Sequence, residues 1–372
     1  MDFSLNDEQQ MLLDTTRRFV ARDYDFDVRR KIVASEAGWS RATWTAMAEL
    51  GLLAVDVSEA DGGIGAGPVG VMLVAQAVGE GLLVEPFVGS AVIASAAIAR
   101  LASAEQRAEW LPALTSGERI AMLAVDEDAL LDASAIDVRA RANGDGWTLD
   151  GNVRCVYHAP AADVLLVAAR VDASIGVFAV DATASGVTRD DIVTVDGQRA
   201  AHLSFDGVTA SARLGDGDAT AALQAVMDRG LAALCADAFG VLDRILKATI
   251  DYSRQRVQFG APIGSFQALQ HRMADMLMLM EQARSMLYLA TAHCLDDDAV
   301  ARRRALSGAK VLIGQAARKV GQEAVQLHGG MGMTDELDVS HHFRRLLAFE
   351  LRMGTTDEHL QAYRRASAGG AA

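Results

Sequence analysis

The chain has 372 residues, of which 51% are hydrophobic and 5% aromatic, and a formal net charge of −14. This length exceeds that of a typical single domain, so two or three hydrophobic cores are expected. The negative charge argues against nucleic-acid binding, which needs a basic surface, but it does not exclude a phosphorylated ligand in a local basic pocket.

The spacing of the cysteines and the hydropathy pattern indicate the cellular compartment. Cys155, Cys235 and Cys294 are widely spaced, so neither a metal site nor a disulfide framework is predicted. The first ten residues are acidic and polar, unlike a signal peptide. The long uncharged run at 62–79 is rich in glycine and contains Pro68, so no membrane insertion is predicted. We expect a cytoplasmic protein.

Residues 1–118 are predicted to form an N-terminal helical domain. Ser4 to Asp7 have the spacing of a capping box, and the periodic residues that follow predict a helix through Ala21. Further helices are expected over Arg41–Leu53, with a break at Gly51, and over Val69–Leu83, Val88–Leu101 and Ala104–Leu114. A glycine-rich loop at 61–68 lacks a preceding strand, so it is not a dinucleotide-binding fingerprint.

Residues 119–218 are predicted to form a middle β-domain. Helical spacing gives way to short β-branched runs at 136–139, 164–167 and 176–180. The turn dipeptides of this region are Asp145-Gly146, Asp150-Gly151, Asp196-Gly197, Asp206-Gly207 and Asp216-Gly217. Because aspartate before glycine is typical of tight turns between antiparallel strands, the sheet is expected to be antiparallel.

Residues 219–372 return to helical spacing. The predicted helices are Ala221–Arg254, Phe266–Cys294, Ala299–Leu327, Leu337–Leu347 and a short one from Asp357. The second and third are apolar and rich in alanine, which favours a four-helix bundle. The expected buried face of the second helix consists of Leu269, Met273, Leu277 and Met280.

The first of two glycine turns follows the first bundle helix. Pro262 cannot continue a helix, and Gly260 and Gly264 accept positive φ, so one helix is expected to end near Phe259 and another to begin near Ser265. The arginines at 254 and 256 lie beside backbone N–H groups that no strand or helix is expected to use. This turn is therefore a candidate anion site, although a basic last turn before glycine also simply ends a helix.

The second glycine turn, from Gln326 to Gly332, again follows a long helix. Gly329, Gly330 and Gly332 are three glycines within four residues, and they allow a ligand to approach the backbone closely. Two such turns in one bundle favour ligand binding over mere helix termination.

The two turns together resemble a known family. The run R-x-x-F-G-x-P-I-x-x-F-Q-x-L-Q-H from Arg256, with Q-L-H-G-G-x-G from Gln326, is similar to the C-terminal domain of the FAD-dependent acyl-CoA dehydrogenases. The resemblance covers nearly the whole chain. It implies an α+β, mainly α fold with an N-terminal helical domain, a middle antiparallel β-domain and a C-terminal four-helix bundle.

The resemblance extends to one group within this family through three short stretches: GWSRATW, DGVTASA and ARSM. They look like the small subunits of two-component enzymes, such as the pimeloyl-CoA dehydrogenase type and the related partners in actinobacterial steroid side-chain degradation. In this family a carboxylate removes a proton from Cα of an acyl-CoA thioester, and a hydride leaves Cβ for the flavin.

By the resemblance, the chain lacks the catalytic base. Met353 stands where most of the family has the catalytic glutamate, and Gly230 stands at the position that a minority of the family uses. Glu350, one helical turn before Met353, is a candidate replacement. The preferred interpretation of Glu350 is a solvated glutamate, or one paired with Arg344, Arg345 or Arg352.

The resemblance differs between the two parts of the FAD site, the part that holds the flavin ring and the part that holds the phosphates. The segments that hold the ring in the family correspond to 123–128 and 155–158, where the expected hydroxyl and aromatic groups are missing. The phosphate side is intact and implies an FAD-binding set that reaches a neighbouring subunit: Arg256, Phe259, Gln267, Gln326, Gly329, Gly330 and Thr355.

The expected function is therefore a non-basic subunit of a heteromeric acyl-CoA dehydrogenase, with two copies of each chain. A large subunit, an acyl-CoA substrate and an electron-accepting flavoprotein are the expected partners. Two alternatives stay open. One is a self-sufficient homotetramer with an unusual base such as Glu350, and the other is a scaffold without flavin, for which the acidic Asp357 is a hint.

Overall fold

The computed structural model describes residues 4–144 and 146–368. The chain divides into two compact units, each assembled from segments that are distant in the sequence. Unit 1 comprises Met1–Arg29, Met72–Leu83 and Leu231–Ala372, and unit 2 comprises Arg30–Val71 and Val84–Gly230. The division into three consecutive domains, which rests on the sequence pattern, stays a prediction.

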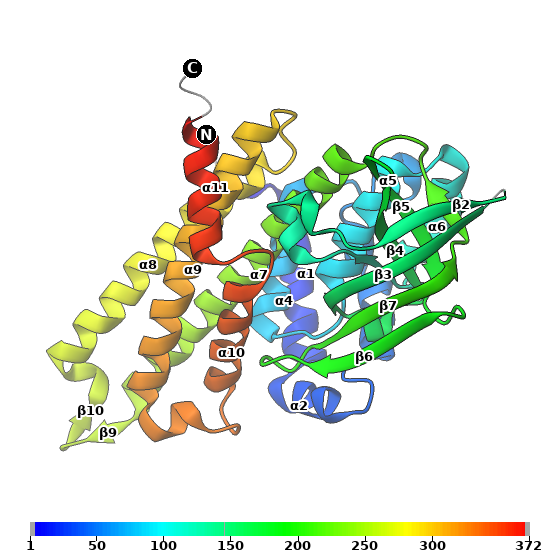
Figure 1. The fold of residues 1–372 in the computed structure, drawn as a ribbon. Helices are drawn as coiled ribbons and strands as arrows, with labels where there is room; N and C mark the ends of the chain where they lie inside the picture. The colour runs from blue at the N-terminus through cyan, green and yellow to red at the C-terminus, as the bar shows by residue number, and fades with distance from the viewer. Residues whose placement is uncertain (1–3, 145, 369–372) are drawn as a thin grey trace. The chain divides into compact units, whose positions relative to one another are not determined.

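Unit 1 is helical (Figure 1). Its elements are α1 (Asp7–Asp23), β9 (Val257–Gln258), β10 (Ala261–Pro262), α8 (Gln267–His293), α9 (Ala299–His328), α10 (Asp338–Leu351) and α11 (Thr356–Ala368), with short 3₁₀ turns at Ile263–Ser265 and Gly329–Met333. The helices α2 (Phe26–Ala34), α4 (Gly67–Gly81) and α7 (Thr220–Gln255) run from one unit into the other.

The first helix begins later than predicted. Asn6, not Ser4, is the N-cap residue of α1, and its side-chain oxygen accepts a hydrogen bond from the Gln9 backbone N–H at 2.8 Å. The Gln9 side chain returns a bond to the Asn6 N–H at 3.1 Å. This reciprocal capping box satisfies two backbone donors, and it forms at Asn6 because a glutamine follows three residues later.

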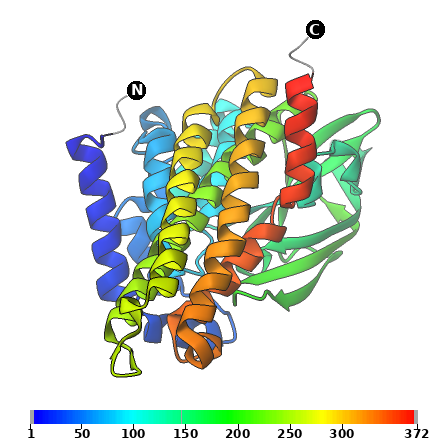
Figure 2. The ribbon, with the colours of Figure 1, turned by 90° about the vertical axis from the view of Figure 1, so that its left-hand side faces the viewer.

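The bundle of unit 1 is built on α8 and α9, which run antiparallel and side by side (Figure 2). The inner face of α8 is formed by Met276, Met280, Ala283, Leu287 and Ala290. The predicted buried face was partly wrong, because Leu277 is 46% exposed. The helical repeat of 3.6 residues allows two neighbouring stripes on α8, and the tertiary contacts selected the one through Met276.

Close backbone contact joins α4 to α7 within unit 1. A Cβ atom added to Gly79 would lie 2.0 Å from the Asp237 carbonyl oxygen, and one added to Gly240 would lie 2.0 Å from that of Gln76. Glycine is therefore required where the two helices cross. Nearby, Arg345 of α10 donates to both carboxylate oxygens of Asp237, at 3.0 and 2.9 Å, which ties α10 to α7.

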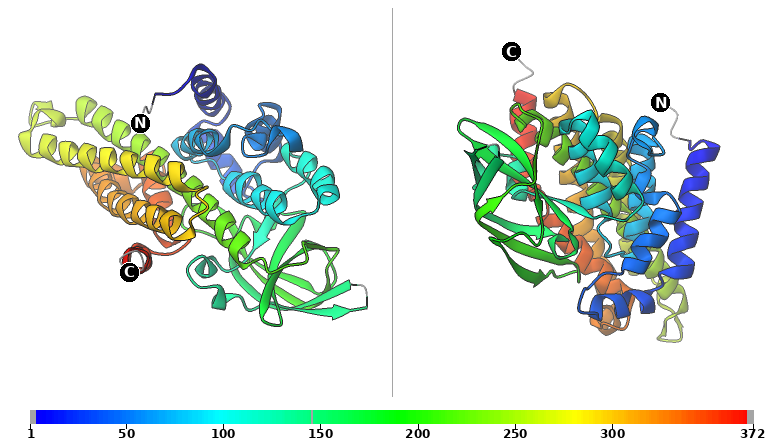
Figure 3. Two further views of the ribbon diagram at one scale, coloured as in Figure 1. Left: turned by 90° about the horizontal axis from the view of Figure 1, so that it is seen from above. Right: turned by 90° about the vertical axis from the view of Figure 1, so that its right-hand side faces the viewer.

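Unit 2 combines short helices with a twisted sheet (Figure 3). Its helical elements are α3 (Arg41–Glu49), the π-helical segment η3 (Phe87–Ala94), α5 (Ser95–Leu101) and α6 (Ala104–Thr115). Its strands are β1 (Ala121–Ala124), β2 (Arg139–Asn143), β3 (Gly146–Tyr157), β4 (Val164–Val171), β5 (Ser174–Asp181), β6 (Val187–Val193), β7 (Arg199–Thr209) and β8 (Ala212–Leu214).

The sheet is mostly, but not wholly, antiparallel. The strand order is β6-β7-β3-β2-β4-β5-β8, and β1 pairs with β4 in parallel, so the purely antiparallel prediction needs this correction. The run at 136–139 was also mispredicted, since regular strand begins only at Arg139. Asp137 instead accepts a hydrogen bond from the Asn152 N–H at 3.1 Å in a loop.

The aspartate-glycine pairs have different structural roles. Asp196-Gly197 makes the predicted turn between β6 and β7. Asp150-Gly151 and Asp206-Gly207 lie inside β3 and β7, where the register shifts and the Gly207 N–H donates to the Asp150 side chain at 2.9 Å. These pairs were wrongly predicted as turns, because a bulge uses the same positive φ as a hairpin turn. Asp145 lies outside the described residues.

Candidate functional site

The first glycine turn is a β-hairpin. After α7 ends at Gln255, β9 pairs with β10, and Phe259 (φ 54°) and Gly260 (φ 81°) form the two-residue connection. Positive φ at both positions is the signature of a type I′ turn, whose twist matches that of paired strands. The expectation that no strand uses this backbone was therefore wrong, because the pairing needs only two residues on each side.

The hairpin presents an aromatic ring and a cation to the surface. Phe259 is 95% exposed, and its ring lies edge to face with that of Phe266, at 6.3 Å between centroids. A bulky residue at positive φ is uncommon and costs conformational energy. The exposed Arg256 guanidinium makes no hydrogen bond or ion pair with any described residue, whereas Arg254 lies 3.6 Å from Asp251. Gln267, at the start of α8, is also exposed.

The second glycine turn is open. Gly329 has φ 59° and ψ −140°, and a Cβ atom added there or at Gly330 would meet nothing within 4 Å among the described atoms. The backbone at this turn is accordingly accessible to a ligand. Gln326, one turn earlier on α9, is exposed.

An aromatic stack brings the two turns together. The Tyr252 ring, in the last part of α7, stacks on the His328 imidazole at the end of α9, with centroids 4.3 Å apart and planes at 27°. The His328 Nδ1 atom lies 2.8 Å from the Ala324 carbonyl oxygen. Burial lowers the pKa of His328, which keeps the imidazole neutral near pH 7. We call Arg256, Gln326, Gly329 and Gly330 the anion corner.

Met353 lies at a buried, strained turn after α10. Its side chain is fully buried and its φ is 54°. The His359 Nε2 atom lies 2.8 Å from the Met353 carbonyl oxygen. The Lys310 ammonium donates to the carbonyl oxygens of Arg352, at 2.9 Å, and Phe349. These bonds hold the turn, and the methionine presents no ionisable group.

Glu350 is engaged by neighbours other than those predicted. Its carboxylate accepts from the Arg318 guanidinium at 3.2 Å, from the Thr356 hydroxyl at 2.8 Å and from the Thr356 N–H at 3.2 Å. Two of the expected arginine partners pair elsewhere: Arg344 with Asp335 and Arg345 with Asp237. Glu350 thus lies at the N-terminus of α11, where a carboxylate stabilises the helix dipole.

Thr355 lies near Glu350 and away from the anion corner. Its backbone N–H and its hydroxyl both donate to the Glu358 carboxylate at 2.8 Å, which caps α11 and lowers the pKa of Glu358. A Cβ atom on Gly314 of α9 would lie 2.5 Å from the Thr356 hydroxyl. Gln326 is twelve residues further along α9, about 18 Å by helical rise. The predicted FAD residues therefore fall in two places.

Within unit 2, Gly230 is buried on α7 beside an ion pair that the sequence did not suggest. Arg229 contacts Asp56, whose side chain is almost completely buried. Burial raises the pKa of Asp56, and the neighbouring guanidinium opposes that shift. A lone arginine inside an apolar helix was the available signal for such a pair.

The two segments that correspond to the ring side are neighbours within unit 2. The Asp126 carboxylate accepts from the Arg154 N–H at 3.0 Å, and burial raises the pKa of Asp126. Cys155 and His158 both have positive φ, and the strand carries a register shift between Val153 and Val156. The segment 155–158 is thus an irregular strand end that carries side chains other than those of the family pattern.

Two residues that support the turn at Met353 were missed by sequence reasoning: Lys310 and His359. Lys310 is fully buried on α9, with its ammonium 3.8 Å from the centre of the Phe349 ring. Its signal was a lysine within the apolar run LSGAKVLIG. Among residues 4–144 and 146–368, no group of three or more histidine, cysteine or acidic side chains could hold a metal ion. In the same ranges, no helix is long and apolar enough to cross a membrane.

Comparison with known proteins identifies the family. The acyl-CoA dehydrogenase N-terminal, middle and C-terminal domain families match residues 6–118, 121–208 and 219–367. Acyl-CoA dehydrogenase FadE27 of Mycobacterium tuberculosis is 31% identical over 365 residues, covering 95% of this chain and 95% of that protein.

Two solved structures show the same fold over 99% of this chain and 99% of the other, both with a TM-score of 0.90. One is a variant of the Tcur3481-Tcur3483 steroid ACAD, at 30% identity. The other is the ChsE4-ChsE5 complex from Mycobacterium tuberculosis, at 29% identity. The chain therefore belongs to the acyl-CoA dehydrogenases, a family of oxidoreductases whose members bind FAD.

Proposed function

We propose that this chain is the small, non-basic subunit of a heteromeric acyl-CoA dehydrogenase. A large partner subunit would supply the carboxylate base and the pocket of the flavin ring. This chain would supply the anion corner, with Phe259, to the FAD held mainly by that partner. The two similar solved proteins, whose names each join two chains, support a heteromer of two kinds of subunit. Two copies of each subunit are part of the proposal.

The chemistry of the family needs a base, and the corresponding positions of this chain lack one. Removal of a proton from Cα of a thioester requires a carboxylate beside the substrate in a dry pocket. Met353 has no ionisable group, and Gly230 has no side chain. Both oxygens of Glu350 are already bonded to Arg318 or Thr356. The side chain of Glu350 is thus committed to capping α11.

The anion corner fits the diphosphate of FAD. The Arg256 guanidinium is exposed and makes no contact with a carboxylate of the described chain. A guanidinium group can donate two parallel hydrogen bonds to the oxygens of one phosphate. The open backbone at Gly329 and Gly330 accommodates a ligand that a side chain would exclude. FAD, when bound, accepts the hydride that leaves Cβ of the acyl group. The role of this chain is to hold and orient that cofactor.

One observation carries the proposal: Arg256 is an exposed cation with no described partner, the turn at Gly329 is open, and the methionine at the predicted base position is buried. Purification of the chain alone, and again after co-expression with the product of the neighbouring open reading frame, tests this. We expect little flavin absorbance and no turnover alone, and one FAD for every two chains in the active complex.

Each alternative predicts a different result in the same experiment. A yellow single-chain preparation that oxidises acyl-CoA at ordinary rates would establish the self-sufficient homotetramer and overturn the proposal. A colourless, inactive complex would establish the scaffold, in which the exposed Asp357 repels a phosphate. The acyl group and the electron-accepting flavoprotein stay predictions.

A further inference from the structure

Unit 2 contains a cavity of about 280 Å³ between α6 and the sheet. Ala113 of α6, Ala121 of β1 and Ala179 of β5 line it, and their short side chains leave space that larger ones would fill. Because protein interiors have few voids larger than a water molecule, a cavity of this size beneath a helix is a candidate site for a small molecule. The rest of its apolar lining consists of Ile98, Leu114, Val164 and Leu166.

The exposed part of the lining is acidic and aromatic. Glu109 and Glu118 are exposed, and neither carboxylate makes a hydrogen bond or ion pair with any residue among 4–144 and 146–368. Trp110, the residue after Glu109, is half-buried in the same lining. A carboxylate without a partner attracts a cation, and so does the face of an indole ring.

The cation in the lining is already close to an acid. Arg119 also lines the cavity. Hydrogen bonds from Thr183 lower the pKa of Asp181, and the Arg119 charge acts in the same direction, so this guanidinium lies near a carboxylate. The charges of Arg119 and Asp181 offset each other, and the two glutamates of the lining then give the cavity a negative potential. This potential disfavours an anionic ligand.

We propose that this cavity binds a small organic cation, an ammonium group on a compact apolar body. The apolar body fills the space over Ala121 and Ala179. The ammonium group lies between the Trp110 ring and the carboxylates of Glu109 and Glu118. The volume suits a free small molecule rather than a protein segment, because a stable protein partner covers about 800 Å² on each side.

The cation site goes beyond the proposed function, because its lining shares no residue with the anion corner. E109Q/E118Q should therefore leave the flavin content and turnover of the heteromeric complex unchanged. Failure of the binding tests below would leave the proposed function intact, and a colourless complex would leave the cation site intact.

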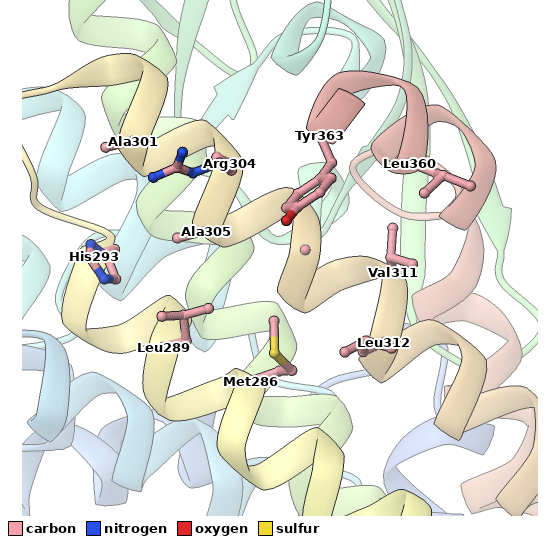
Figure 4. Close-up of a pocket in the computed structure, with 11 residues that line it drawn as sticks. Met286, Leu289, His293, Ala301, Arg304, Ala305, Val311, Leu312, Leu360 and Tyr363 are labelled. Carbon is pink, nitrogen blue, oxygen red and sulfur yellow. The ribbon is translucent and has the colours of Figure 1, made fainter. Parts of the chain in front are cut away.

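The groove of unit 1 between α8, α9 and α11 has the opposite charge (Figure 4). Arg304 and His293 lie in its lining, together with apolar side chains such as Leu289, and no carboxylate lies among the described residues that line it. An apolar molecule fits this surface, but Arg304 repels an ammonium group. The groove therefore serves as the comparison site within the same chain.

Probes that differ in charge test the sign of the cavity. They are 2-phenylethylammonium, the neutral 2-phenylethanol and the anionic 3-phenylpropanoate, and saturation-transfer NMR on the full chain measures each Kd. We expect a Kd of about 1 mM for the ammonium probe, which has about nine non-hydrogen atoms. The alcohol should bind about fivefold more weakly, and the carboxylate more weakly still. Equal binding of all the probes, or no binding of the ammonium probe, overturns the proposal.

Charge variants test the position of the ammonium group. E109Q/E118Q should weaken binding of the ammonium probe about tenfold and leave that of the alcohol unchanged. E49Q/E105Q is the matched control, because it removes two exposed carboxylates outside the lining, and it should leave both probes unaffected. Equal weakening in the two double variants would show general charge attraction and overturn the site.

Variants that alter the apolar surface test the location. A113F should fill the cavity and abolish binding, whereas L289W, in the groove of Figure 4, should not change it. W110L should weaken binding of the ammonium probe about fivefold, and W39L, at another half-buried tryptophan, should have no effect. Binding that is lost in L289W and kept in A113F and W110L would place the probe in the groove and overturn the proposal.

Discussion

At the scale of single residues, the contrast between Arg256 and Met353 decides the interpretation. One is a charged side chain that meets no partner in the described chain, and the other is a buried apolar side chain at the predicted position of the family base. Exposed charge without a partner is available to a ligand, whereas buried methionine serves only packing and turn geometry. The residues thus favour cofactor support over proton abstraction.

The first prediction concerns Arg256. Arg256→Ala should lower the affinity of the heteromeric complex for FAD by about tenfold or more, because a charged hydrogen-bond donor to phosphate is lost. Flavin absorbance after dialysis measures the retention. Arg254→Ala is the matched control, since Arg254 lies two residues away and already contacts Asp251. Equal retention in the two variants would contradict the role of Arg256.

The second prediction separates a helix cap from a base at Glu350. Glu350→Ala should lower the free energy of unfolding by about 1 kcal/mol, because the Thr356 N–H and the Arg318 guanidinium lose an acceptor. Turnover by the complex should change less than about threefold relative to Glu281→Ala, an exposed control on α8. A loss of turnover by several orders of magnitude would identify Glu350 as the base instead.

At the scale of elements, the hairpin after α7 pairs an unfavourable backbone conformation with an exposed ring. Phe259 adopts positive φ, although asparagine or glycine fits that position of a type I′ turn better. Its ring gains little from burial, being 95% exposed. Strain that gives no local stability is a mark of function. The hairpin and the stack of Tyr252 on His328 together shape the anion corner.

The third prediction follows from this strain. Phe259→Asn should raise the free energy of unfolding of the isolated chain by up to about 1 kcal/mol, because asparagine tolerates the left-handed conformation. The same change should reduce flavin retention by the complex, since the aromatic contact is lost. Chemical denaturation and flavin absorbance measure the two effects. A variant that is both less stable and fully loaded with flavin would contradict this account.

At the scale of the whole molecule, buried histidines make stability depend on pH. Burial lowers the pKa of His359 to about 4, with the Lys310 charge acting in the same direction. Burial also lowers the pKa of His341 to about 4. The unfolded chain then binds protons below about pH 6.5 that the folded chain does not take up until about pH 4. Stability is therefore greatest above the unfolded pKa and falls as the pH drops toward the folded one.

The fourth prediction tests this linkage. The free energy of unfolding should fall by about 3 kcal/mol between about pH 7 and pH 4 through His359 alone, given about 1.4 kcal/mol for each unit of pKa. His359→Gln should remove that share of the pH dependence, and His271→Gln, at an exposed position, should not. Urea titrations at several pH values measure it. A stability that rises on acidification would contradict the buried, neutral imidazole.

Local chemistry explains which parts of the fold the sequence predicted well. The bundle helices begin and end within a few residues of their predicted bounds, because proline, glycine and apolar periodicity act over neighbouring residues. The same local signals gave wrong predictions where one dipeptide, Asp-Gly, occurs both in hairpin turns and in irregular strand positions. Asp150-Gly151 and Asp206-Gly207 form opposing irregularities in β3 and β7, and only the pairing of the two strands decides that.

The features of the candidate site also fall into those set by local sequence and those set by tertiary contacts. The sequence alone determined that glycine turns follow two long helices and that one turn carries Arg256. It also predicted that Met353 replaces the family glutamate. Only the tertiary structure decided that Tyr252 stacks on His328, that Glu350 bonds Arg318 and Thr356, and that Thr355 lies away from the anion corner. The physical reason is that these contacts join residues far apart in the chain, whose approach depends on packing among helices.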